Sequence, residues 1–389
     1  MPALLNPILP PLSLYIHIPW CVRKCPYCDF NSHEARQSIP EQEYVQALLA
    51  DSEHDLKHVH GRTLESIFIG GGTPSLFSPE SLDRLMSGLK TRFKFSDNIE
   101  ITLEANPGTV EQQKFNEFYN LGINRLSIGV QSFNNDMLSR LGRIHDRQAA
   151  IKAAEAAHYA GFERFNLDLM FGLPQQNIQQ ALKDLEYATS LQPEHISWYQ
   201  LTLEPNTLFY QQPPSLPQDD QIGDMQQQGQ AFLANHAYQQ YEISAYTKHQ
   251  ACKHNMNYWQ FGDYLAIGAG AHAKLSGPGP SNIQRLQRCR HPQDYLRDAH
   301  LEKVISQRKV LSPADLTLEF MMNALRLNKG VSTETFLQNT GLEIETIRSP
   351  MDTALELGLM LAKDGKIQAS ARGHQYLNDL LELFMEPAT

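Results

Sequence analysis

Three cysteines stand close together near the start of the chain, in the stretch "CVRKCPYC" (21–28). Their spacing lets the thiolates of Cys21, Cys25 and Cys28 converge on one centre from a single loop. Thiolates are soft ligands, which favour zinc or iron–sulfur clusters. Two residues beyond the third cysteine, the chain has Phe30 and not a fourth ligand. The loop therefore predicts a metal centre with three protein thiolates.

Three kinds of site are compatible with such a loop. A structural zinc site takes four protein ligands, and His33 is the candidate for the fourth. Buried thiols without a metal are a second alternative, although Arg23, Lys24 and Asp29 make the loop polar. A four-iron cluster held by three cysteines leaves one iron free to bind a small molecule. This open position explains Phe30 most simply, so a [4Fe–4S] cluster is the expectation.

A second stretch with the composition of a binding loop is "GGGTP" (70–74), which follows an apolar run. Glycine has no Cβ, so the backbone of such a stretch can come close to a ligand. An ordinary tight turn needs one glycine and not three. We expect this stretch to contact whatever binds beside the cysteine loop.

Both stretches follow short apolar runs of the kind that form β-strands. Helix-like segments lie between these runs, for example residues 79–93, with Pro79 at a helix start, and residues 147–161, with a terminal glycine. Strands that alternate with helices predict parallel β-α units. The six runs cover residues 14–19, 66–72, 99–107, 125–133, 164–174 and 195–205.

Six β-α units predict an α/β fold, a partial (β/α)6 barrel. The runs are apolar on both faces or nearly so, as buried parallel strands usually are. Reactive groups of such barrels gather at the carboxyl ends of the strands. The cysteines, the glycine stretch, Glu104, Asn106 and Gln131 all fall at or just beyond these ends. We therefore expect them on one rim of the barrel.

After the last run the pattern changes, and the chain from about residue 311 is mostly helical. We predict two domains: residues 1–300, a barrel with the cysteine loop and an extension, and residues 301–389, a smaller, mainly helical domain. Asp364-Gly365 is a turn signal that predicts a short hairpin in the second domain.

Composition narrows the function classes. A net charge of −10 argues against binding to nucleic acid. The sequence has no apolar stretch of the length of about 18 residues that a membrane span needs, so an integral membrane protein is not expected. The first residues lack the basic flank of a secretory signal, and five cysteines, three of them clustered, suit a reducing cytoplasm better than disulfide stapling.

The cysteine motif, with Tyr27 just before the last cysteine, resembles the signature of the radical S-adenosylmethionine (SAM) superfamily. The resemblance implies a [4Fe–4S] cluster on Cys21, Cys25 and Cys28, with the amine and carboxylate of SAM on the fourth iron. In that superfamily the reduced cluster cleaves the sulfonium to a 5′-deoxyadenosyl radical, and a "GGGTP"-like stretch binds the methionine amine.

The order of "LEANP" (103–107), "SIGVQSF" (127–133), "LGRIHD" (141–146) and "NLDLMFGLP" (166–174) resembles the oxygen-independent coproporphyrinogen III oxidase family. A carboxylate can accept from ammonium or hydroxyl groups, and an arginine can pair with a carboxylate. By motif position, the resemblance implies these SAM contacts: Tyr15, Tyr27, Gly71, Gly72, Thr73, Glu104, Gln131, Arg143 and Asp168.

Two features set the chain apart from the oxidases of that family. The oxidases have a further cysteine at the position of Phe30 and a longer arm before the first cysteine, whereas 20 residues precede Cys21 here. Both features resemble the haem chaperone (HemW) branch, which carries an H-N-x-x-Y-W motif. This chain has "HNMNYW" (254–259), and the resemblance extends over essentially its whole length.

The hexapeptide suits haem chemically, because an imidazole can ligate haem iron and aromatic rings can cover a porphyrin. His254 is the candidate haem ligand, with Cys252 and His272 as other candidates. The alternative is a packed aromatic corner in which His254 makes a structural hydrogen bond.

The resemblance implies a cytoplasmic haem chaperone that passes haem to acceptor proteins, with membrane-associated respiratory enzymes among the candidates. A radical SAM protein without coproporphyrinogen III oxidase activity is then expected. A homodimer formed near the cluster loop is a further candidate arrangement. Oxidative decarboxylation of coproporphyrinogen propionates stays open as the alternative function, and a structural zinc module as a third.

Overall fold

The computed structural model describes residues 9–108, 112–277 and 282–385. The six strand predictions each correspond to a parallel strand, and the strands adjoin one another in chain order. They are β1 (Leu12–Ile18), β4 (Leu64–Gly71), β5 (Phe95–Ala105), β6 (Arg125–Gln131), β7 (Phe165–Phe171) and β8 (His195–Gln200). The predicted α/β fold with a partial (β/α)6 barrel is confirmed.

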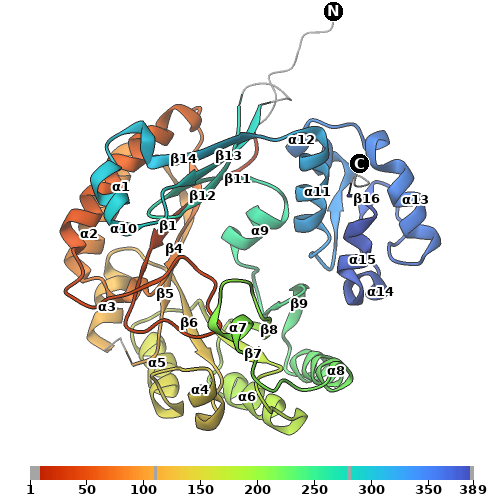
Figure 1. The fold of residues 1–389 in the computed structure, drawn as a ribbon, viewed down its shortest axis with the longest axis horizontal. Coiled ribbons are helices and arrows are strands. Elements are labelled where there is room, and N and C mark those ends of the chain that lie inside the picture. Colours follow the sequence, from red (N-terminus) through yellow and green to blue (C-terminus); the bar gives the residue numbers. More distant parts are fainter. Residues whose placement is uncertain (1–8, 109–111, 278–281, 386–389) are drawn as a thin grey trace, which may run out of the picture.

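The sheet continues past both ends of the barrel strands, so that within the described residues it has twelve strands. On one side β11 (Asp263–Ile267) runs parallel to β1 and is followed by antiparallel β12 (His272–Ser276), β13 (Ile283–Arg288) and β14 (Ile305–Val310). On the other side β10 (Ala245–Thr247) and β9 (Gln239–Glu242) add antiparallel strands. The sheet curves into an open arc and does not close (Figure 1).

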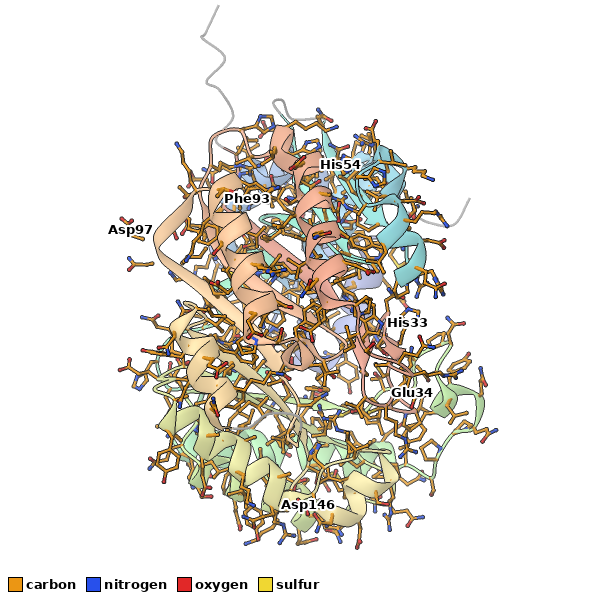
Figure 2. The ribbon with its side chains drawn as sticks, turned by 90° about the vertical axis from the view of Figure 1, so that its left-hand side faces the viewer. His33, Glu34, His54, Phe93, Asp97 and Asp146 are labelled. Atoms are coloured by element: carbon orange, nitrogen blue, oxygen red, sulfur yellow. The ribbon has the colours of Figure 1, made fainter. Side chains whose placement is uncertain are left out.

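Helices cover the outer face of the arc, as Figures 1 and 2 show. In Figure 2, His54 and Phe93 mark the ends of two of them, α1 and α2, which lie side by side. The outer helices are α1 (Glu41–Asp55), α2 (Pro79–Arg92), α3 (Gln112–Asn120), α4 (Asn135–Arg140), α5 (Arg147–Tyr159), α6 (Ile178–Ser190), α8 (Asp219–Asn235) and α10 (Pro292–Asp298). Two short helices lie elsewhere: α7 (Leu208–Gln211), and α9 (Lys253–Trp259) on the concave side.

Local sequence accounts for where these helices begin and end. The Ser78 side chain accepts a hydrogen bond from the backbone N–H of Ser81, and Pro79 occupies the first helical position of α2, as predicted. Asp146 caps α5 in the same way, and Gly161 just after that helix has a φ of +90°. Glycine adopts this left-handed conformation without the cost that a Cβ imposes. These caps therefore account for where α2 begins and for where α5 begins and ends.

The chain after β14 is mainly helical and packs around a second hydrophobic core, which Phe261 and Ile283 from the preceding part of the chain share. Its other members include Leu316, Phe320, Phe336 and Ile347. The helices of this part of the chain are α11 (Pro313–Ala324), α12 (Thr333–Thr340), α13 (Arg348–Glu356), α14 (Ala371–Gln375) and α15 (Leu377–Glu382). Strand β14 still pairs with β13 of the large sheet. The domain boundary between residues 300 and 301 stays a prediction.

The expected hairpin around Asp364 and Gly365 is reduced to one antiparallel bridge, between Met360 and Ala369. The strand that follows the turn, β16 (Lys366–Ile367), pairs with β15 (Val331–Ser332). Strand β16 thus pairs with a segment that is distant in the sequence, and a local turn signal does not predict such a pairing.

Candidate functional site

The three cysteines lie on the loop that follows β1. Cys21 ends a short strand, β2 (Trp20–Cys21), which pairs with β3 (His33–Glu34), so both ends of the loop are held together. The backbone N–H of Cys28 donates to the carbonyl of Cys25 over 3.1 Å. All three thiols are free and line one cavity. Burial raises the pKa of the Cys21 and Cys28 thiols, so they are protonated without a metal. Three free cysteines on one loop are the type of ligand set that an iron–sulfur cluster takes once they are deprotonated.

Arg143 reaches the cysteine loop from the turn after α4. Its Nη1 lies 3.6 Å from the Sγ of Cys25. Its Nη2 donates to the Oδ1 of Asn106 over 2.9 Å and to the carbonyl of Gly129 over 2.6 Å. The guanidinium is thus fixed as a positive charge beside a thiol. We expected Arg143 to pair with a carboxylate, and the structure adds contact with a cysteine.

A cavity of about 480 Å³ extends from the cysteine loop into the barrel. It brings together the three predicted cluster cysteines and all but one of the predicted SAM contacts. Those that line it are Cys21, Cys25, Cys28, Tyr27, Gly71, Gly72, Thr73, Glu104, Gln131, Arg143 and Asp168. The exception is Tyr15, which lies one layer further back. Its hydroxyl is 2.9 Å from His17 Nδ1, and its ring stacks on Phe68, a residue of the cavity wall.

The glycine stretch is also required for packing, a reason beyond the approach to a ligand that we expected. A Cβ on Gly72 would lie 2.4 Å from the carbonyl oxygen of Trp20, and one on Gly71 would lie 2.6 Å from the His17 ring. The Gly71 φ of +118° also disfavours any side chain. These glycines are therefore needed for the packing of the stretch against β1 and the cysteine loop, while their backbone still lines the cavity.

Two carboxylates line the cavity beyond the cysteines. Glu104 accepts from the backbone N–H of Gly71 over 2.9 Å, and burial, aided by nearby Asp168, raises its pKa to about 8. Asp168 accepts from Ser127 and Asn166, each over 2.8 Å, and burial raises its pKa as well. Both carboxyls could bind ammonium or hydroxyl groups of a ligand.

Gln131 ends β6 in a backbone conformation that is rare for its residue type, with a φ of +69°. Its Oε1 accepts from the hydroxyl of Tyr199 over 3.0 Å. Strained positions of this kind are typical of functional sites. The conformation is compatible with the predicted role of Gln131 in SAM binding.

The wall also contains residues that sequence reasoning missed: Arg125, Ser127, Asn166, Ser197 and Tyr199. We expected the strands to be apolar on both faces or nearly so. Instead, alternate residues of β6, β7 and β8 point polar groups into the barrel. The signal was present, because side chains on one face of a strand recur at every second position.

Helix α9 carries the "HNMNYW" motif and lies on the concave side of the sheet (Figure 1). Asn255 and Trp259 line the cavity. His254 does not; its side chain is 2 % exposed, with Nδ1 3.0 Å from Ser66 Oγ and the ring stacked on Phe68. Burial lowers its pKa to about 3. Its Nε2 has no hydrogen-bond partner among the described residues. The ligand role of His254 stays a prediction.

The other metal and haem candidates lie apart. The His33 ring (labelled in Figure 2) packs edge-on against His291, with ring centres 5.8 Å apart. Cys252 is buried and its thiol donates to Glu100 over 3.3 Å, while His272 is exposed. Within residues 9–108, 112–277 and 282–385, no three His, Cys, Asp or Glu side chains are placed to hold a single metal ion.

Comparisons with known proteins agree with this architecture. The Radical SAM superfamily model matches residues 15–188, and the HemN C-terminal domain model matches residues 311–376. The heme chaperone HemW of Haemophilus influenzae is 50% identical over 97% of this chain and 99% of its own length, and HemW of Escherichia coli is 49% identical over 97% and 99%. This chain belongs to the HemW family.

Two further comparisons extend the picture. HemW of Bacillus subtilis is 34% identical over 96% of this chain and 99% of its own length. The solved structure of the radical SAM enzyme coproporphyrinogen III oxidase (HemN) of E. coli superposes with a TM-score of 0.80 at 24% identity, over 97% of this chain and 90% of that one. This second likeness establishes a shared fold. In the described part of the chain, no helix has the length and apolar character for crossing a bilayer.

Proposed function

We propose that this chain is a haem chaperone, which binds haem and transfers it to acceptor proteins. The observation that carries the proposal is the 50% identity to a heme chaperone HemW over nearly the full length of both proteins. The cavity supports it, since the motif helix α9 contributes Asn255 and Trp259 to the wall that the cysteine loop also lines.

We propose further that Cys21, Cys25 and Cys28 hold a [4Fe–4S] cluster and that SAM occupies the adjoining part of the cavity. A bound cluster supplies one-electron redox chemistry and an iron with an open coordination position. Arg143 beside Cys25 provides positive charge near the cluster, and Glu104 and Asp168 offer acceptors for SAM. The buried position of the cavity walls restricts water around these charges, which strengthens their interaction with a ligand.

For the haem, His254 stays the candidate ligand. Its unpartnered Nε2 is suited to a metal, but its place between Ser66 and Phe68 keeps it behind the cavity wall. Coordination by His254 therefore requires helix α9 to shift. Trp259, already on the wall, offers flat apolar surface for a porphyrin.

Haemin titration of the purified protein tests the proposal. We expect saturable binding at one haem per chain with a shifted Soret band, and a changed band in His254→Ala. His236→Ala is the control, because His236 is exposed and its ring Nδ1 bonds the carbonyl of Phe232 one turn earlier in the chain. Absence of a Soret shift in the wild type would refute haem binding, and an unchanged band in His254→Ala would remove His254 as the ligand.

Anaerobic reconstitution tests the cluster separately. Cys25→Ser should lose iron and sulfide but keep haem binding. Cys289→Ser, which removes a free thiol outside the loop, should keep the cluster as well as haem binding. Zinc in place of iron in oxygen-free wild-type protein would support a structural zinc module. An anaerobic assay with coproporphyrinogen III distinguishes the chaperone from an oxidase, because only the oxidase should form decarboxylated product at useful rates.

Three further points remain predictions. They are the acceptor proteins, for which respiratory enzymes at the membrane are candidates, a cytoplasmic location, and a homodimer near the cluster loop. Acceptor proteins can be identified by haem transfer from the loaded chain, followed as a shift of the Soret band to the acceptor. Sedimentation of the reconstituted protein measures the oligomeric state.

A further inference from the structure

The guanidinium of Arg125 is a buried cation without a partner in the described part of the chain. This residue opens β6, is 2 % exposed and lines the cavity. Among the described residues its side chain makes no hydrogen bond or ion pair, and its Nε is a buried donor without an acceptor. Burying a charge is costly unless it is paired and hydrogen-bonded. A guanidinium left in this state inside a cavity indicates that its partner is a ligand.

The acidic residues around Arg125 are engaged elsewhere. Glu100 pairs with Arg164 over 2.9 Å and accepts from the thiol of Cys252 and the N–H of His254. Glu194 lies 3.6 Å from Arg164 and accepts from the hydroxyl of Thr247. Cys252, Glu100, Tyr241 and Glu194 together raise the pKa of Arg125 despite its burial. None of them bonds to it.

A second unpartnered donor lines the same cavity. The indole Nε1 of Trp259 is buried and has no acceptor among the described residues. The Trp259 ring is held in place by Arg326, whose guanidinium carbon lies 4.3 Å from the ring centre. Arg326 in turn donates to Glu242 over 2.9 Å. The tryptophan is therefore fixed from the side of the helical C-terminal region, and its donor remains available.

We propose that Arg125 binds a carboxylate of the molecule that occupies the inner part of the cavity, and that this carboxylate is a haem propionate. The inference rests on the proposed haem-chaperone function. A planar guanidinium matches the two oxygens of a carboxylate. Glu100 and Glu194 nearby disfavour a doubly charged phosphate, because repulsion grows with the ligand's charge.

Three arginines line the cavity, and Arg23 is exposed on the cysteine loop, whereas the other two have separate roles inside. Arg143, at the cysteine loop, is occupied by Cys25, Asn106 and Gly129. Arg125 is the buried cation that the described part of the cavity leaves without a hydrogen-bond or ion-pair partner. Trp259 offers a second hydrogen bond or a ring face to the same ligand. The haem would thus lie between the helix α9 that bears His254 and the start of β6.

The test compares haemin with haemin dimethyl ester, in which both propionates are neutral, in the same buffer and detergent. Wild-type protein should bind the ester about 10- to 100-fold more weakly than haemin, the range expected for losing a hydrogen bond to a charged group. Arg125→Gln should weaken haemin binding by a similar factor and leave ester binding unchanged. Arg125→Lys should restore part of the affinity.

Arg164→Gln is the matched control, because Arg164 faces the same Glu100 and Glu194 without lining the cavity. It should leave the ratio of haemin to ester affinity unchanged. If the wild type binds haemin and its ester equally, or if Arg125→Gln weakens SAM binding and not haemin binding, the inference is overturned while the chaperone function stands. If the wild type binds no haemin, both fall.

Discussion

The Nη1 of Arg143 lies 3.6 Å from the Sγ of Cys25, although 117 residues separate the two in the chain. A fixed cation beside a cysteine that would ligate a cluster stabilises added negative charge there. This contact joins the turn after α4 to the loop after β1.

Replacing Arg143 by Met should make the reduction potential of the reconstituted cluster more negative, because the reduced cluster loses a nearby positive charge. The variant should also lose about 1–3 kcal/mol of unfolding free energy, since Asn106 and the Gly129 carbonyl lose their donor. A potentiometric titration followed by electron paramagnetic resonance measures the first effect. Arg147→Met, whose guanidinium bonds Phe133, is the control. An unchanged potential in Arg143→Met would contradict the role.

Gly72→Ala should destabilise the protein by at least about 1–3 kcal/mol, since the new Cβ would lie 2.4 Å from the Trp20 carbonyl oxygen. It should also lower iron uptake, because relief of the clash displaces the cysteine loop. Gly223→Ala is a contrasting control: it lies in helix α8 with nothing within 4 Å of a new Cβ and should stabilise by about 0.5–1 kcal/mol. Urea denaturation measures both, and equal effects would refute the packing explanation.

His254 should make the protein less stable in acid. Burial lowers its pKa to about 3, so the folded state resists the proton that the unfolded chain binds near pH 6.5. The unfolding free energy is therefore unaffected by this histidine above pH 6.5, and it decreases as the pH falls from 6.5 toward 3. From pH 7 to pH 5 this amounts to about 2 kcal/mol. On going from pH 7 to pH 5, His254→Gln should lose about 2 kcal/mol less unfolding free energy than the wild type. Urea denaturation at the two pH values measures this difference. Equal losses in the two proteins would contradict a buried neutral imidazole.

Glu104 should act in the opposite direction. Its pKa is raised to about 8 by burial and by Asp168, so the folded state holds a proton that the unfolded chain releases near pH 4.5. Stability is therefore lost as the pH rises toward 8, by about 2 kcal/mol between pH 6 and pH 8. Glu104→Gln should remove this loss, because the amide stays neutral and can still accept from Gly71. A pH dependence that is the same in both proteins would show that Glu104 is ionised throughout.

The cysteine spacing and the alternation of strands and helices were enough to predict the barrel and the place of its site. Local spacing determines which thiols share a loop, and parallel strands put their carboxyl ends on one rim. These are short-range properties of the chain. The family motifs extended this to Glu104, Gln131, Arg143 and Asp168, all of which line the cavity.

Only the tertiary structure decided how individual side chains are used. His254 and Trp259 belong to one short motif, yet the first is packed against Phe68 and the second lines the cavity. The unpaired state of Arg125 depends on Arg164, which is distant in the sequence and takes the neighbouring carboxylates. Burial and pairing are sums over contacts between remote segments, so a sequence pattern places a residue on an element but does not determine what surrounds it.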